Sequence, residues 1–478
     1  MPRAAAVKFA RDTMNNGRFH SDLARRVAIR TVSQDPALAR ELRRYLDGLA
    51  ADITDLGFKS TIHDCPDPRG GPILIARRDE MKGAPTLLCY GHGDVVRGLE
   101  AHWNDGRNPW EISLDGERIY GRGTADNKGQ HTILLLALEA VQKARGGNLG
   151  FNVTLLIETS EEVGSPGLRE FCRDNRDLLQ ADLLISSDGP RLARDQPIVI
   201  LGTRGVFSFD LLCDLRASAH HSGNWGGLIA NPAVLLAHAI ASLVSSQGRI
   251  AVRDVLPAAV DPAVRQALVN CRIEAGTDGP EIDAWWGEPG LSPAERVTAW
   301  TALEVLAFKA GDAEHPVNAI PARAVAYCQL RFPVDANSKD FLTAIQDHLR
   351  AQGHLRVSAR DAAERGSFTA TRLDPRDPAA RWAANSIERT LGVSPVVVPN
   401  LGGTLPNDCF AVELGMPTLW IPHSYQGCRQ HAGDEHLLAG LVEEGLAMMA
   451  GLFWDLGALQ SAWWRGGERS AAESAISV

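Results

Sequence analysis

The feature that most constrains the fold is the alternation of short apolar runs with a helical pattern in the first part of the chain. Apolar runs that close in turn residues occupy residues 72–78, 84–94, 151–162 and 181–190, and residues 130–144 carry an amphipathic helical pattern. Runs of this length predict buried strands. Because strands separated by helices form sheets with mainly parallel strands, we expect an α/β domain with helices covering the sheet.

The pattern changes near Thr203, which predicts a second domain. Residues 206–215 alternate apolar and polar side chains, residues 231–244 carry a helical pattern, and residues 322–333 form another strand pattern. After residue 374 a long helical pattern and two short apolar segments follow, which we expect to rejoin the first sheet. The prediction is therefore a discontinuous first domain, residues 1–203 and 374–478, interrupted by an inserted α+β domain, residues 204–373.

The composition and net charge of the chain limit the kinds of molecule that it is expected to bind. The 478 residues are 45% hydrophobic and 22% charged, a balance typical of a globular protein that is too long for one core. The net charge of −9 and the lack of any Lys or Arg run argue against a nucleic-acid partner and favour a small molecule. No stretch reaches the roughly 18 consecutive apolar residues of a membrane span, so no membrane partner is expected.

The cysteines and the first residues bear on the compartment. The eight cysteines are scattered, with no CxxC pair, which favours a reducing compartment and hence the cytoplasm. Residues 1–19 lack the apolar block of a secretory signal. Arg3, Lys8 and Arg11 leave an Arg-rich targeting helix as the alternative, against which Asp12 argues.

Several apolar runs of the first domain end in side chains that can bind a metal ion. His92 and Asp94 follow one run, two residues apart, so both side chains lie on one face of an extended segment. Asp94 can then accept a hydrogen bond from the second ring nitrogen of His92 and strengthen the other nitrogen as a ligand. The adjacent carboxylates Glu161 and Glu162 end another run, and Asp188 ends a third.

Two loops supply further candidates. Asp126 lies among glycines directly before the helical pattern at residues 130–144, where a tight backbone turn could bring a carboxylate into a site. His431, Glu435 and His436 precede the last helical pattern, but their HxxxEH spacing does not match the HExxH zinc helix. Each candidate alone has an ordinary alternative, such as a helix-capping or turn aspartate, a solvated acidic loop or a surface histidine.

Together, the candidates predict a metal centre. The imidazoles of His92 and His431 with the carboxylates of Asp126, Glu162 and Asp188 form an N/O ligand set suited to zinc, with cobalt or manganese as alternatives. The three carboxylates offset most of the charge of two divalent ions. Glu161 is left over beside the ions, as a general base in hydrolysis requires.

At this point the sequence resembles the M20 metallopeptidases, a group that includes carnosinase-like dipeptidases, glutamate carboxypeptidases, aminoacylases and deacylases. The resemblance runs through nearly the whole chain and rests on GHGD at 91–94, YGRGTADNKG at 120–129, EEVGS at 161–165, Asp188 and His431. It implies a zinc-exopeptidase-like catalytic domain. It also implies that the inserted domain is a ferredoxin-like lid that serves as the dimerisation surface of a homodimer.

The resemblance assigns a role to each residue of the metal centre. Asp126 bridges two zinc ions, His92 and Asp188 complete one site, and Glu162 and His431 complete the other. Asp94 orients His92. Glu161 activates the attacking water and passes its proton to the leaving amine. No GxSxG nucleophile elbow is present, so a covalent acyl-enzyme is not expected.

The inserted domain and one late loop supply the remaining assignments. HHSGNWGG at 220–227 matches the lid motif of the family, so His221 is expected to stabilise the oxyanion, across the dimer or within the chain; its alternative is a polar turn residue. Asn318 and Arg331 resemble the family's contacts to the substrate carboxylate, although an Arg at a strand end is commonly only a surface residue. Gly403 and Thr404 resemble the loop that offers backbone N–H groups to the same end of the substrate.

The predicted function is hydrolysis of the peptide bond of dipeptides or short peptides. Asp188 stands where deacylases and glutamate carboxypeptidases of the family tend to have Glu, and the lid motif is similar to that of the carnosinase-type branch. The alternative is an N-acyl-amino-acid amidohydrolase. A more distant alternative is a binding protein that kept the fold without the reaction, for which a missing ligand or base would be expected; here none is missing.

Overall fold

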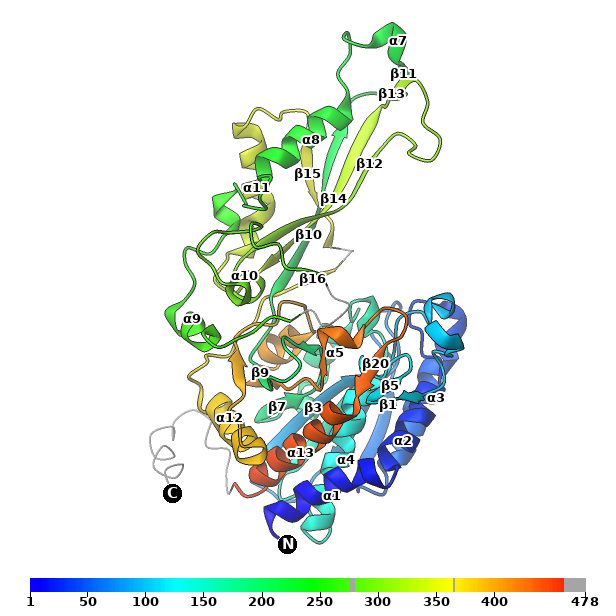
Figure 1. Cartoon of the computed structure of the whole chain (residues 1–478), viewed down its shortest axis with the longest axis vertical. Helices are drawn as coiled ribbons and strands as arrows, with labels where there is room; N and C mark the ends of the chain where they lie inside the picture. The colour runs from blue at the N-terminus through cyan, green and yellow to red at the C-terminus, as the bar shows by residue number, and fades with distance from the viewer. Residues whose placement is uncertain (275–279, 364–365, 460–478) are drawn as a thin grey trace.

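The computed structural model describes residues 1–274, 280–363 and 366–459, and it has two parts, each built on its own sheet (Figure 1). The larger sheet has eight strands in the order β1-β2-β6-β3-β7-β18-β9-β17. Its strands are Lys59–His63 (β1), Ile73–Arg78 (β2), Thr86–His92 (β3), Asn152–Glu158 (β6), Leu183–Ser186 (β7), Ile198–Ile200 (β9), Val396–Val398 (β17) and Thr418–Trp420 (β18). The late segments around β17 and β18 thus rejoin the first sheet, as predicted.

Parallel pairing dominates the part of this sheet that carries the predicted ligands. β3 pairs in parallel with both β6 and β7, and β7 pairs in parallel with β18. Antiparallel pairs occur between β1 and β2, between β2 and β6, and between β18 and β9. The prediction of a mixed, mainly parallel sheet is therefore confirmed.

Helices pack on both faces of the large sheet because its strands are apolar on both sides. Leu87 and Cys89 of β3 join one core, whereas Leu88 and Tyr90 join the core on the opposite face. The first face is covered by helices at Arg3–Asn15 (α1), Arg18–Val27 (α2), Ala39–Asp52 (α3), Lys128–Ala144 (α4), Pro378–Leu391 (α12) and Ala439–Leu456 (α13). The second face packs against Leu168–Asp174 (α5) and the helical turn Cys409–Glu413.

The second part is an antiparallel sheet with helices on one face. Its strands are Gly205–Asp214 (β10), Ala302–Ala310 (β12), Arg323–Phe332 (β14) and Ser358–Asp361 (β15), with Ser367–Phe368 (β16) beside β10. The order β12-β14-β10-β15, with Pro232–Leu243 (α8) after β10 and Phe341–Ala351 (α11) after β14, is the ferredoxin-like βαββαβ arrangement. Both helices pack against the sheet in one core.

Two chain segments connect the two parts and lie side by side. The backbone N–H of Thr203 donates to the carbonyl of Thr371, and the N–H of Thr371 donates back to Thr203. The side-chain amide of Asn400 donates to both of these carbonyls, at 3.2 and 2.7 Å. Among the helices that the structure describes, none combines the length and the apolar character needed to cross a membrane.

Candidate metal centre

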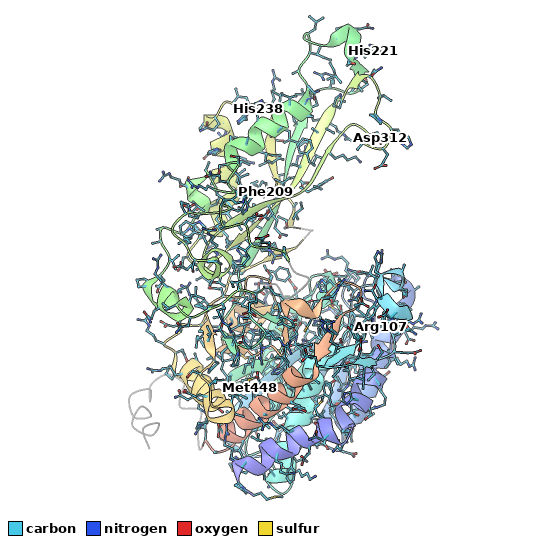
Figure 2. The ribbon with its side chains drawn as sticks, viewed as in Figure 1. Arg107, Phe209, His221, His238, Asp312 and Met448 are labelled. Carbon is cyan, nitrogen blue, oxygen red and sulfur yellow. The ribbon has the colours of Figure 1, made fainter. Side chains whose placement is uncertain are left out.

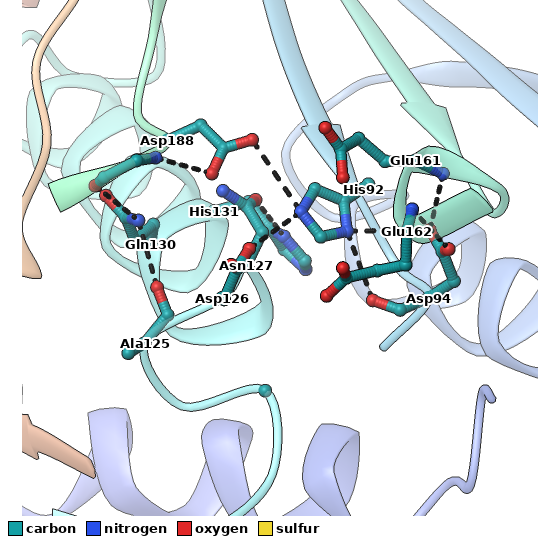
Figure 3. A network of polar contacts seen from close by, with 12 residues as sticks. His92, Asp94, Ala125, Asp126, Asn127, Gln130, His131, Glu161, Glu162 and Asp188 are labelled. Carbon is teal, nitrogen blue, oxygen red and sulfur yellow. Dashed lines mark hydrogen bonds and ion pairs between the residues drawn. The ribbon is translucent and has the colours of Figure 1, made fainter. Parts of the chain in front are cut away.

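His92, the last residue of β3, is fully buried and faces two carboxylates (Figure 3). Its Nε2 atom lies 3.0 Å from Oδ1 of Asp126 and 3.6 Å from Oδ2 of Asp188. The contact with Asp188 arises because β3 and β7 are parallel neighbours, so their carboxyl ends meet at one edge of the sheet. Asp126 comes from the loop before α4. His92, Asp126 and Asp188 form one group of side chains whose ligand atoms all lie within 4.8 Å of one another.

Asp94 supports both His92 and the adjacent glutamates. The Nδ1 atom of His92 lies 3.1 Å from the backbone carbonyl of Asp94 and 3.5 Å from its carboxylate. That carboxylate accepts the backbone N–H groups of Glu161 and Glu162, both at 3.1 Å (Figure 3). Asp94 therefore holds the turn after β6 as well as lying beside the His92 ring.

A second group forms around Asp126. Nε2 of His431 lies 2.9 Å from Oε2 of Glu162 and 3.2 Å from Oδ2 of Asp126, and these three residues again have ligand atoms within 4.8 Å of one another. Asp126 thus belongs to both groups and presents a different carboxylate oxygen to each histidine. The Glu162 side chain is only 3% exposed, whereas the His431 side chain is 56% exposed, so this side of the centre is open to solvent.

The loop that carries Asp126 is held by a buried glutamate from the other end of the chain. The carboxylate of Glu435 accepts the backbone N–H groups of Gly123, Ala125 and Asp126 at 2.9–3.1 Å. It also accepts a hydrogen bond from Nη1 of Arg122 at 2.6 Å. Glu435 lies four residues after His431, so it joins the loops that carry these two candidate ligands.

The first turn of α4 fixes the strand end that carries Asp188. Nδ2 of Asn127 donates to the carbonyl of Ser187 at 2.8 Å, and Nε2 of Gln130 donates to the carbonyl of Gly189 at 3.3 Å. Sequence reasoning did not single out Asn127, Gln130 or Arg122. Their partners Ser187, Gly189 and Glu435 are distant in the sequence. The available signal was therefore only that all three residues lie within four positions of Asp126.

The electrostatics of the two groups point to a cation. Burial raises the pKa of Glu162 to about 7 and that of Asp188 to about 6, and in each case the Asp126 carboxylate adds to the effect. Hydrogen bonds to Asp126 and Glu162 raise the pKa of His431 to about 11. Burial would raise the pKa of Asp126, but hydrogen bonds from His431 and His92 hold it below its usual range.

Glu161 lies beside both groups and is not a member of either. Burial raises the pKa of its carboxyl group well above the usual value, and the charges of Asp188 and Glu162 raise it further. A carboxyl group with a raised pKa is a better proton acceptor when it ionises, which is the property that a general base in a hydrolase needs.

The residues present suit divalent metal ions. Oε1 of Glu162 and Oδ2 of Asp188 are buried carboxylate oxygens without a hydrogen-bond partner. Unpaired buried carboxylates are costly, and coordination of a cation would remove that cost. The donor set, imidazole nitrogens and carboxylate oxygens, is the one that zinc and neighbouring divalent metals prefer.

Comparison with known proteins identifies the family. The model of Peptidase family M20/M25/M40 matches residues 88–455, which include every residue of the two groups. The chain belongs to this family.

Individual relatives extend the match over most of the chain. The cysteinylglycine-S-conjugate dipeptidase of Corynebacterium striatum is 28% identical over 404 residues, which are 82% of this chain and 85% of that protein. The Beta-Ala-His dipeptidase of Rattus norvegicus is 24% identical over 450 residues, 89% of this chain and 87% of the relative. The solved structure of the dipeptidase Dug1p from Saccharomyces cerevisiae has a TM-score of 0.78 at 21% identity, covering 95% of this chain and 99% of that one, which shows a shared fold.

Two predicted site residues of this M20 chain lie away from the metal centre. His221 is exposed at the far end of the second sheet, opposite the part that carries Arg107 and Met448 (Figure 2). Asn318 is an exposed neighbour, since its carbonyl accepts the N–H of Ser222 at 2.8 Å. Within one chain, neither residue is brought to His92 or His431.

Arg331 and the loop around Gly403 and Thr404 are brought together. Nη1 of Arg331, near the end of β14, donates to Oγ1 of Thr404 at 2.7 Å. Gly403, the neighbour of Thr404 in the sequence, is exposed. This contact links the second sheet to the loop that follows β17 of the first sheet.

Proposed function

We propose that this M20 chain is a metallodipeptidase that uses two divalent metal ions to hydrolyse the peptide bond of dipeptides or short peptides. The observation that carries the proposal is the shared position of Asp126 in two groups of candidate ligands, with Glu161 beside both. A site with one shared carboxylate and one free carboxylate has the parts that a two-metal hydrolase requires.

The proposed ligands follow the two groups. His92 and Asp188 would hold one ion, Glu162 and His431 the other, and Asp126 would bridge them. We propose zinc, with cobalt or manganese as alternatives, because two imidazoles and three carboxylates suit these ions. The bound ions supply Lewis acidity, which polarises the scissile carbonyl and makes water acidic near neutral pH.

The side chains around the ligands have distinct tasks in this proposal. Glu161 accepts a proton from the attacking water and later donates it to the departing amine nitrogen. Asp94 keeps Glu161 in place through the backbone N–H of that residue, at 3.1 Å, and keeps the His92 ring oriented. His221 would stabilise the developing oxyanion.

The substrate class is proposed from the curated relatives and from Arg331. Both relatives described above are named as dipeptidases. A dipeptide has a free carboxylate one residue from the scissile bond, and the Arg331 guanidinium together with the Gly403–Thr404 loop can hold it. An N-acyl amino acid has the same carboxylate, so N-acyl-amino-acid amidohydrolase activity is the second candidate.

We further propose a cytoplasmic homodimer. His221 and Asn318 are exposed at the tip of the second sheet, so a partner subunit is the simplest way to bring them to a metal centre. All eight cysteines are free thiols, which supports a reducing compartment.

The test is elemental analysis of protein purified without chelators, followed by assays of dipeptides and N-acetyl amino acids before and after metal removal. We expect about two zinc ions per chain and dipeptide hydrolysis that is lost on stripping and restored by zinc or manganese. A folded protein that binds no metal on titration would overturn the proposal. Turnover of N-acetyl amino acids alone would favour the second candidate.

A further inference from the structure

Arg204 is a buried residue beside the proposed substrate-carboxylate loop. Its side chain is buried, with 6% of the residue exposed. Nε and Nη2 both donate to the carbonyl of Gly402, at 3.0 and 2.9 Å. Nη1 lies 3.4 Å from the carbonyl of Trp300. Arg204 therefore anchors the residue that directly precedes Gly403 and Thr404.

Arg204 and Arg331 hold this loop together. In the antiparallel register of β10 and β14, Val206 lies opposite Arg331, so Arg204 lies near the same end of the sheet. Arg331 donates to Oγ1 of Thr404 at 2.7 Å, and that hydroxyl lies 3.4 Å from the backbone carbonyl of Arg204. Two guanidinium groups thus bind one three-residue loop, Gly402–Thr404.

The charges of these two arginines are only partly balanced, by the carboxylate of Glu304 near Arg204. Neither guanidinium forms an ion pair with a carboxylate in the part of the chain that the structure describes. Burial, with the charge of Arg331, lowers the pKa of Arg204 to about 9, while the exposed Glu304 opposes that change. A buried cation beside a half-buried one is unfavourable in the free protein, and a bound anion would relieve the repulsion.

We infer that Arg204 is a positioning residue of a two-arginine anion subsite: it holds the Gly402–Thr404 loop and adds a second positive charge that selects substrates with a free C-terminal carboxylate. The inference rests on the proposed function, because it concerns the substrate end of the same site. Arg331 is the residue suited to direct contact, since it is only half-buried and its Nη1 donates to the side chain of Thr404, next to the exposed Gly403. Arg204 acts through the carbonyl of Gly402 and through its charge.

The experiment compares a dipeptide with its C-terminal amide on the metal-free protein, in which binding is measured without turnover. L-alanylglycine and L-alanylglycinamide are titrated calorimetrically into the wild-type chain, Arg204→Met and Arg204→Lys. We expect the wild type to prefer the free acid, and Arg204→Met to weaken binding of the acid about tenfold while the amide changes little. Arg204→Lys keeps the charge but not the two-pronged contact, so its preference is expected to be intermediate.

Arg145→Met is the matched control. Arg145 is also a partly buried arginine whose pKa is lowered by burial, and it donates to a backbone carbonyl, that of Trp454, at 2.8 Å. It lies at the end of α4, away from the Gly402–Thr404 loop. Its substitution is expected to change stability but not the preference for the acid.

Several outcomes would overturn the inference. If Arg204→Met weakens binding of the acid and of the amide equally, Arg204 only supports the fold. If Arg204→Met weakens binding of neither ligand, Arg204 is not part of the subsite. If Arg204→Met does not fold, Arg204→Lys provides the test. A preference of Arg204→Lys for the acid over the amide equal to that of the wild type would contradict the inference. A wild-type chain without preference for the acid would exclude the subsite itself.

The metal-loaded enzyme separates this inference from the proposed function. With turnover, Arg204→Met should raise KM for the free acid about tenfold and leave kcat within about twofold, because the contact is made in the ground state as well as in the transition state. A wild-type chain that binds the acid but does not hydrolyse it would refute the proposed function. The binding comparison would still decide the role of Arg204.

Discussion

At the scale of single residues, Asp126 is the position on which both candidate metal groups depend. Its Oδ1 atom faces His92 at 3.0 Å and its Oδ2 atom faces His431 at 3.2 Å. Three hydrogen bonds from backbone N–H groups to Glu435, including its own, fix the direction of the side chain. A bridging carboxylate needs this rigidity, since a small rotation would move one oxygen out of reach of its group.

Glu161→Gln should remove the general base and leave the metal ligands in place. The amide cannot accept a proton from water, so we expect kcat to fall by roughly 10²–10⁴. Elemental analysis should find the same metal content as in the wild type, because Glu161 belongs to neither group. Glu170→Gln, on the exposed surface of α5, is the control and should change neither quantity. Unchanged turnover in Glu161→Gln would refute the assigned base.

Metal binding should release protons, and its affinity should rise with pH. In the metal-free chain the pKa of His431 is about 11, so its ring is protonated near pH 8. Burial lowers the pKa of His92, but its contacts with Asp126 and Asp94 outweigh burial and raise it. A histidine binds metal only after losing a proton, so raising the pH removes a competitor of the metal. Zinc titration at pH 8 in buffers of different ionisation enthalpy should detect proton release that includes the His431 proton.

The same titration has an internal control, and it also predicts how the number of released protons changes with pH. His431→Gln should lower the number of released protons by about one, since one ring is removed. Glu162, with a pKa of about 7, and Asp188, with a pKa of about 6, retain protons only at lower pH, so more protons should be released at pH 6 than at pH 8. Binding without proton release at either pH would contradict the assigned ligands.

At the scale of elements, the part of the site that follows strands could be predicted from sequence. β6, β3 and β7 are adjacent and parallel, so His92, Glu162 and Asp188 meet because the carboxyl ends of parallel strands lie at one edge. The loops before α4 and before the strand His436–Leu438 (β20) could not be placed in this way. Glu435 joins them through partners more than 300 residues away, and no local pattern encodes such a contact.

Glu435→Gln should therefore disturb two elements at once. The carboxylate has 1% exposure and binds Arg122 and three backbone N–H groups, so a neutral amide leaves the Arg122 charge buried and cannot accept all of these bonds. We expect a loss of about 3–5 kcal/mol in the free energy of unfolding. We also expect weaker zinc binding, because the loops of Asp126 and His431 lose their common support.

Chemical denaturation and zinc titration check this prediction. Glu443→Gln, an exposed position in α13, is the control and should stay within about 0.5 kcal/mol of the wild type. A Glu435→Gln protein with wild-type stability and zinc affinity would show that the two loops are held by other contacts.

At the scale of the whole molecule, the sequence predicted both sheets and the return of the chain to the first one, but not where the second part lies. Strand and helix patterns predicted a second domain, and the family resemblance implied its ferredoxin-like order. The orientation of that part depends on the paired segments at Thr203 and Thr371 and on Asn400. As a result, Arg331 meets Thr404 within one chain, while His221 stays at the distant tip.

This separation makes a specific prediction for the proposed homodimer. If His221 acts in the site of the partner subunit, a chain with His221→Ala keeps an intact Glu161, and a chain with Glu161→Gln keeps an intact His221. Each homodimer should be nearly inactive. A heterodimer of the two variants contains one complete site, formed by Glu161 of one chain and His221 of the other.

Mixing the two variants therefore distinguishes a shared site from a site within one chain. After equal amounts of the variants are unfolded and refolded together, half of the dimers are heterodimers. One of the two sites in each heterodimer is complete. Activity should then recover to about a quarter of the wild-type value per chain. Each variant refolded alone provides the baseline. If His221 acts within its own chain, no combination restores a complete site and activity stays at that baseline, because both sites of every heterodimer then lack one of the two residues.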